Sequence, residues 1–122
     1  NVEILGETSG VKAFYNESAI FVSVSPVENF LSNVILEAFS SGLPVVASDV
    51  GETRNIIQNG ENGMLVPPKE PRALADALLF LLSDETIYAR MSKGAFETAK
   101  QYDINTVGPK FARVYEEALS SM

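Results

Sequence analysis

The chain contains no cysteine, no histidine and no tryptophan among its 122 residues. The absence of cysteine and histidine excludes disulfides, thiolate nucleophiles and the commonest zinc ligands. Carboxylates could still hold magnesium, but no cluster of aspartates and glutamates has a suitable spacing for it. We therefore expect no metal and no cofactor.

Positive charge is also scarce. The chain has nine lysines and arginines and sixteen aspartates and glutamates, which gives a formal net charge of −7. Nucleic acids and anionic membranes attract clustered basic residues, so this balance argues against both as direct partners. No apolar run approaches the ~20 residues that cross a bilayer.

The length allows one domain at most, and apolar residues make up 46% of the chain. A domain of this size buries roughly 60–70% of its unfolded surface, and this composition is typical of a packed globular protein. The first residue is Asn1, and an apolar run follows it at once. We therefore expect the chain to be a piece of a longer protein.

Four short apolar segments predict strands, over residues 2–5, 19–24, 45–47 and 64–66. The second is almost continuously apolar, as in a strand covered by helices on both sides. Because helical patterns separate these segments, the sequence predicts an α/β fold with a parallel sheet flanked by helices.

Two helices are expected in the first half of the chain. Ser9 can cap a brief helix that buries Val11, Phe14 and Tyr15 on one face, where Tyr15 is interpreted as a packing residue. The other helix begins near residue 33 and ends at Gly42, which suits the left-handed position after a helix.

The second half is predicted to be mostly helical, after a short helix over residues 53–58. Pro71 suits the first turn of a helix whose apolar stripe consists of Leu74, Ala77, Leu78, Leu81 and Leu82. Asp84 can cap a helix to about residue 101, which turns inward Ile87, Met91, Ala95 and Thr98. A final helix should hold Pro109 in or near its first turn, with one face formed by Val107, Phe111, Val114 and Ala118.

The stretch from Ser25 to Asp49 carries the pattern with most chemical meaning. Glu28 precedes a helix that Ser32 or Asn33 can cap, and Glu37 lies just over one turn inside it. The free N–H groups and dipole of a helix start suit a phosphate or pyrophosphate. Carboxylates repel phosphate, so these two would grip sugar hydroxyls instead. The plainer alternative is two ordinary surface glutamates.

Three motifs in this region resemble those of a known family: SPVENF at residues 25–30, NVILEA at 33–38 and SGLPVVASDVG at 41–51. They are similar to the donor-binding region of GT-B glycosyltransferases, and more narrowly to the retaining group 1, or family 4, enzymes. The likeness continues through residues 56–66 and the later helices, and so covers essentially the whole chain. It implies a Rossmann-like parallel sheet flanked by helices, with residues 1–122 forming part of a C-terminal GT-B domain.

The resemblance also implies roles for particular residues. Glu28 would be the catalytic residue that contacts the donor sugar, and Glu37 would bind the nucleotide ribose. The backbone from Phe30 to Asn33 would hold the pyrophosphate. The donor-binding set would be Asn29, Phe30, Leu31, Ser32, Asn33 and Glu37. The donor would be a UDP- or GDP-linked sugar, and the acceptor hydroxyl would be bound by an N-terminal domain that this chain lacks. The chain alone should therefore be inactive.

Two departures from the family pattern stand out. Eight residues separate Glu28 from Glu37, where the family has seven, and the extra residue falls at Leu31 or Ser32. Where the family has a second glycine and then a glutamate, this chain has Glu52 and Asn55. The first change bears on the pyrophosphate-binding loop, and the second on donor preference.

Two other functions fit the same pattern. The chain could be a non-catalytic α/β interaction module, or part of a nucleotide-sugar epimerase of the same architecture. The resemblance implies a cytoplasmic protein, with membrane-peripheral attachment of the full-length protein as the alternative. In the resembled fold the sheet order is 3-2-1-4-5-6, and this chain begins at strand 3. Residues 20–24 would then form an open sheet edge, closed by the chain's own first strand or by an edge-to-edge homodimer.

Overall fold

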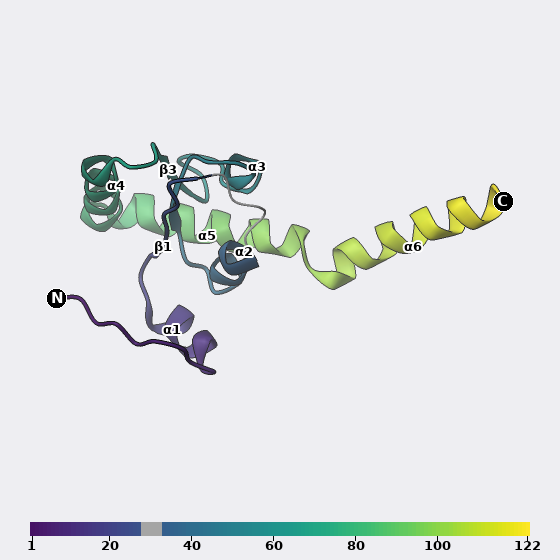
Figure 1. Cartoon of the computed structure of the whole chain (residues 1–122), viewed down its shortest axis with the longest axis horizontal. Coiled ribbons are helices and arrows are strands. Elements are labelled where there is room, and N and C mark those ends of the chain that lie inside the picture. Colours follow the sequence, from purple (N-terminus) through teal and green to yellow (C-terminus); the bar gives the residue numbers. More distant parts are fainter. Residues whose placement is uncertain (28–32) are drawn as a thin grey trace.

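The computed structural model describes residues 1–27 and 33–122, in which helices and short strands alternate (Figure 1). The elements are α1 Val11–Glu17, β1 Phe21–Ser23, α2 Asn33–Ser40, β2 Val45–Ser48, α3 Thr53–Ile56, β3 Gly63–Val66, α4 Pro71–Ser83, α5 Glu85–Gln101 and α6 Ile104–Ser120.

The sheet consists of three parallel strands in the order β1-β2-β3. Val22 of β1 is in register with Val46 of β2, which is in register with Met64 of β3. All four residues of the central strand β2 are buried, as expected of a parallel strand covered on both faces. The predicted α/β fold and its parallel set of strands are confirmed.

The core lies on both sides of β2. Val45 and Ala47 pack against α2 and α3 on one side, and Val46 packs against α4 on the other. Helix α5 serves both halves, since its Met91 belongs to one cluster and its Ala95 to the other. The alternating side chains of a single strand therefore hold the layers together.

The N-terminal segment differs from expectation. Residues 2–5 form no strand, and Val2 and Ile4 are more than nine-tenths exposed. A strand needs a hydrogen-bonding neighbour, and in the described part of the chain β1 pairs only with β2. The prediction that the chain's own first strand closes the sheet edge is therefore wrong. Edge-to-edge pairing of two copies stays a prediction.

Helix α1 is also less buried than predicted. Its N-cap is Gly10 without a side-chain cap, so the expected cap by Ser9 is wrong. Of the three residues expected to share a buried face, Tyr15 is buried, whereas Val11 and Phe14 are about two-fifths exposed. With no strand at residues 2–5, the described residues cover those two side chains only in part.

The later helices largely follow the sequence. Pro71 begins α4, and the Asp84 carboxylate accepts hydrogen bonds from the backbone N–H groups of Thr86 (2.8 Å) and Ile87 (3.1 Å). Gly42 has φ of +72°, as predicted for the residue after α2. Leu82 is an error of prediction, because it is 64% exposed at the rim of the α4 stripe.

Helix α6 extends away from the rest of the chain (Figure 1) and contains no buried residue. Its expected apolar face is mostly uncovered among the described residues: Val107 is half-buried, whereas Phe111 and Val114 are each 62% exposed. The Asp103 carboxylate caps the helix by accepting from the N–H of Asn105 (2.8 Å), which places Pro109 inside the helix. Pro109, expected in or near the first turn, lies in the second turn, because the cap at Asp103 sets the start of the helix.

Candidate functional site

The carboxyl ends of the three parallel strands meet at one edge of the sheet, where ligands bind in open α/β folds. Two hydrogen bonds join the segments that follow the strands. The backbone N–H of Ser25 donates to Oγ of Ser48 (3.1 Å), and the N–H of Asp49 donates to the carbonyl of Val66 (2.8 Å). This edge is therefore an ordered platform and not three independent loops.

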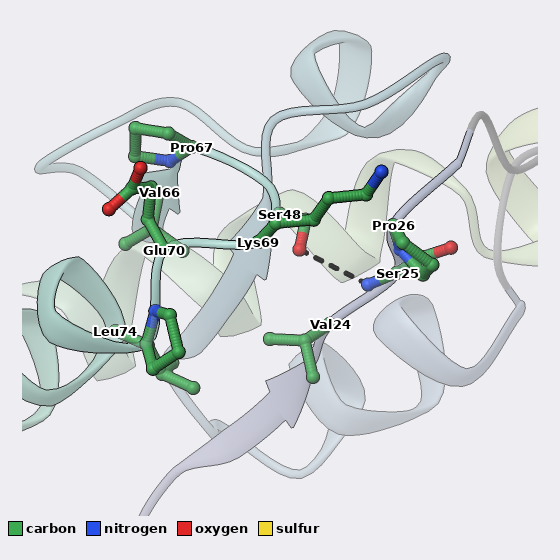
Figure 2. A pocket seen from close by; sticks show the side chains of 10 residues that line it. Val24, Ser25, Pro26, Ser48, Val66, Pro67, Lys69, Glu70 and Leu74 are labelled. Atoms are coloured by element: carbon green, nitrogen blue, oxygen red, sulfur yellow. Dashed lines mark hydrogen bonds between the residues drawn. The ribbon is translucent and has the colours of Figure 1, made fainter.

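A cavity of about 250 Å³ opens at this edge (Figure 2). Its lining comes from the ends of all three strands and from the start of α4, and is mostly apolar: Val24, Ser25, Pro26, Ser48, Val66, Pro67, Lys69, Glu70, Pro71 and Leu74. The Lys69 side chain extends across it towards Ser25 and Pro26 (Figure 2). Within residues 1–27 and 33–122, no ion pair involves Lys69. The cavity thus combines a mostly apolar wall with one lysine and one glutamate side chain.

The segment of sequence between the cavity and α2 contains most of the predicted donor-binding residues. Glu28, Asn29, Phe30, Leu31 and Ser32 lie outside the described residues. Before this segment, Oγ of Ser25 donates to the carbonyl of Val27 (2.9 Å), which forms a tight turn. After it, Asn33 is the exposed first residue of α2.

Glu37 lies just over one turn inside α2, as the sequence predicted, and is exposed. Its carboxylate accepts a hydrogen bond from the hydroxyl of Tyr15 in α1, with 3.1 Å between the two oxygens. Tyr15 is 8% exposed, and its ring packs against Phe21 with 5.6 Å between centroids. A buried ring thus carries a hydroxyl to an exposed carboxylate.

Burial raises the pKa of Tyr15, and the hydrogen bond to Glu37 and the negative charge of that carboxylate raise it further. All three effects favour the neutral phenol, which keeps its proton and remains a donor. A hollow of about 430 Å³ opens between α1 and α2 at this pair, lined by Val11, Lys12, Tyr15, Asn16, Glu37, Ser40 and Ser41.

Sequence reasoning placed Glu37 but missed two features. It interpreted Tyr15 as packing, whereas the side chain both packs and donates a hydrogen bond. The two residues are 22 positions apart, and no local spacing predicts that α1 brings them together. It also passed over Lys69, whose only local signal is its position between Pro68 and the helix start.

The residues after β2 depart from the resembled family in a definite way. Asn55 donates a hydrogen bond from its side-chain amide to the carboxylate of Glu52, so the two residues that differ from the family pattern contact each other. Nearby, Arg54 pairs with Asp49, with 3.0 Å between nitrogen and oxygen. Both members of that pair are substantially exposed, and such pairs contribute little stability.

Two kinds of feature are absent from the described residues. Residues 1–27 and 33–122 hold no group of three or more potential metal-ligating side chains. Nor does any described helix have the length and apolar character to cross a membrane. A metal-independent site stays a prediction.

Comparison with known proteins places the chain in a family. The sequence model described as "Glycosyl transferases group 1" matches residues 1–84. The phosphatidyl-myo-inositol mannosyltransferase of Mycobacterium leprae is 40% identical over 88 residues, which cover 72% of this chain and 24% of that protein. The chain belongs to the group 1 glycosyl transferases.

Solved structures agree with this assignment. The Anabaena protein Alr3699/HepE, crystallised with UDP and glucose, superposes with a TM-score of 0.87 at 28% identity, covering 99% of this chain and 32% of that one. The C-terminal domain of the group 1 protein LpcC from Francisella tularensis gives a TM-score of 0.72 at 29% identity, covering 84% and 53%. The expected fold, part of a GT-B domain, is confirmed. The chain spans about a quarter of the length of the mannosyltransferase it matches.

Proposed function

We propose that this chain is the nucleotide-sugar binding part of a retaining glycosyltransferase, which transfers a sugar from a nucleoside diphosphate donor to an acceptor hydroxyl. The observation that carries the proposal is the Glu37 carboxylate, held by Tyr15 near the start of α2. The Anabaena relative bound to UDP and glucose supports a nucleoside diphosphate as the ligand class.

The proposed division of labour follows from charge. The diphosphate is anionic, so it belongs against the backbone N–H groups at the start of α2 and not against a carboxylate. Lys69, whose side chain lies over the neighbouring cavity, adds positive charge at the same edge of the sheet. Glu37 then accepts hydrogen bonds from the ribose hydroxyls.

Chemistry would occur at the anomeric carbon of the donor sugar. Its bond to the diphosphate oxygen breaks, and the electron pair leaves with the diphosphate. The acceptor oxygen forms the new bond on the same face and passes its proton to the oxygen of the departing diphosphate. Positive charge develops on the sugar between these events, and the Glu28 carboxylate would stabilise it. The acceptor would be held by a part of the protein outside this chain.

The test is a calorimetric titration of UDP, GDP and ADP into the full-length protein, followed by incubation with the matching nucleotide-sugars. The proposal predicts tight binding of one nucleotide class and transfer to an acceptor with release of the diphosphate. An epimerase would instead convert the nucleotide-sugar into its sugar epimer. An interaction module would bind none of the three nucleotides, and either result would overturn the proposal.

A further inference from the structure

In the described part of the chain, the contact between Tyr15 and Glu37 joins α1 to a predicted ligand-binding side chain. The Tyr15 hydroxyl donates to Oε2 of Glu37 at 3.1 Å. Among the described residues, no other side chain donates a hydrogen bond to this carboxylate or forms an ion pair with it. The position of the Glu37 carboxylate therefore depends on one donor.

That donor is itself fixed. Tyr15 is 8% exposed, belongs to the main core cluster, and packs its ring against Phe21 of β1. Tyr15 is the only buried residue of α1. Its packing therefore sets how this helix lies on the sheet. The hydroxyl is thus anchored through the ring to the sheet, and not through the mobile end of a surface side chain.

An exposed glutamate has three rotatable side-chain bonds, and ordering it on ligand binding costs conformational entropy. A donor present before the ligand arrives reduces that cost, which is the effect of preorganisation on affinity. The hydroxyl uses only part of the capacity of Oε2 and none of Oε1, because an ionised carboxylate has about four acceptor positions. Both oxygens remain open to further donors.

We propose that Tyr15 is a positioning residue, which holds the Glu37 carboxylate in the orientation that accepts both hydroxyls of the nucleotide ribose. This inference rests on the proposed function, and adds to it a residue that acts through Glu37 without touching the ligand. It also assigns a specificity: the oriented carboxylate distinguishes ribose from 2′-deoxyribose, since the deoxy sugar offers one donor fewer.

The raised pKa of Tyr15 agrees with this role, because the phenol stays protonated throughout the neutral range. Lys12 also lines the hollow between α1 and α2. It makes no ion pair with Glu37 in the described part of the chain, so tyrosine and not lysine orients the carboxylate.

The experiment compares Tyr15→Phe with a matched control, Tyr88→Phe, in the full-length protein. Tyr88 in α5 also donates its hydroxyl, to the backbone carbonyl of Ala19 (2.7 Å), so its variant removes the same atom from a purely structural bond. The probe is whichever of UDP, GDP and ADP binds the wild type most tightly, together with its 2′-deoxy form. Affinities come from calorimetry, and thermal midpoints monitor folding.

For Tyr15→Phe we expect the ribonucleotide affinity to fall about three- to tenfold, with a smaller fall for the deoxy form. The ratio of ribonucleotide affinity to deoxyribonucleotide affinity should therefore move closer to one. Tyr88→Phe should lower the thermal midpoint but leave that ratio unchanged. In a Glu37→Ala background, Tyr15→Phe should have no further effect on affinity.

Three outcomes separate the possible failures. Wild-type protein that binds none of the nucleotides would overturn the proposed function and this inference with it. Wild-type binding with an unchanged ratio in Tyr15→Phe, or an equal loss in the Glu37→Ala background, would overturn the role of Tyr15 alone. If Tyr15→Phe folds poorly, Glu37→Gln is the second variant, since it keeps the shape of the side chain. It should narrow the same ratio, and an unchanged ratio would contradict the assignment.

Discussion

Ser25 and Ser48 tie the first two strand ends together, through the hydrogen bond from the backbone N–H of Ser25 to Oγ of Ser48. Ser48 is 3% exposed, so water has little access to replace this acceptor. The bond holds Ser25, three residues before Glu28, against the end of the central strand. Local order at this edge thus depends on a hydroxyl in a strand that is otherwise apolar.

Ser48→Ala should lower the free energy of unfolding by about 1–3 kcal/mol, because it leaves a half-buried N–H without an acceptor. It should also weaken nucleotide binding, since Ser25 loses its anchor. Ser83→Ala is the control: its hydroxyl donates to a carbonyl on the exposed surface of α4 and should matter little. Denaturant unfolding of the full-length variants measures the difference, and equal stabilities would contradict this role for Ser48.

Gly94→Ala should destabilise the domain strongly. A Cβ at Gly94 would lie 2.2 Å from the carbonyl oxygen of Glu61, so α5 would have to move away from the turn before β3. Gly108→Ala in α6 is the comparison, because the nearest atom beyond its chain neighbours would lie 3.9 Å from the added Cβ. The helix propensity of alanine favours that variant, whereas Pro109 disfavours a Cβ on the helical residue before it, so its stability should change much less than that of Gly94→Ala. Equal shifts of the two thermal unfolding midpoints would refute this packing argument.

Alkaline pH should reveal the environment of Tyr15. Its pKa is raised by burial first and by Glu37 second, whereas an unfolded tyrosine ionises near about pH 10. The stabilisation is therefore complete below about pH 10, and is lost as the pH rises towards the folded-state pKa. Wild-type stability should fall more steeply above this pH than that of Tyr15→Phe. Parallel stability curves from pH 8 to 11 would show that the phenol is not perturbed.

Glu28 should matter more for turnover than for affinity, because the charge it is expected to stabilise develops only in the transition state. Glu28→Gln should therefore lower kcat while changing the nucleotide-sugar Kd little. Asn29→Ala is the comparison that tests the assignment of the extra loop residue. If Asn29→Ala abolishes turnover and Glu28→Gln preserves it, the catalytic position belongs to residue 29.

Much of the fold could be predicted because local sequence patterns determine it. The buried strands are continuous apolar runs. The helix ends are marked by residues with strong preferences for them: Pro71 at the start of α4, Gly42 after α2 and Asp84 at the cap of α5. The strand predicted at residues 2–5 failed for a non-local reason: an apolar run becomes a strand only where another strand can pair with it. The apolar face of α6 failed in the same way, because a helical stripe predicts burial only if a partner covers it.

The candidate site was predictable in part. Helix α2 begins where expected, so the depth of Glu37 inside it follows from the sequence. Its hydrogen bond to Tyr15 does not, since it depends on how α1 packs. Asn62 is a similar case: it reads as a turn residue, yet it is 1% exposed and bonds to Gln58, Ile56 and Thr98. Such buried amides satisfy backbone groups from several elements, which no local spacing specifies.

The most direct test of the central claim is the nucleotide affinity of Glu37→Ala in the full-length protein, with Glu85→Ala as control. Glu85 is an exposed glutamate in the first turn of α5 and keeps the change of charge the same. Loss of a hydrogen-bonding charge typically costs about 1.5–3 kcal/mol, or about ten- to 150-fold in Kd. We predict that loss for Glu37→Ala, with a thermal midpoint lowered only by the loss of the hydrogen bond from Tyr15, and wild-type affinity for Glu85→Ala. Equal affinities of the two variants in calorimetry would contradict the assignment of Glu37 to the nucleotide ribose.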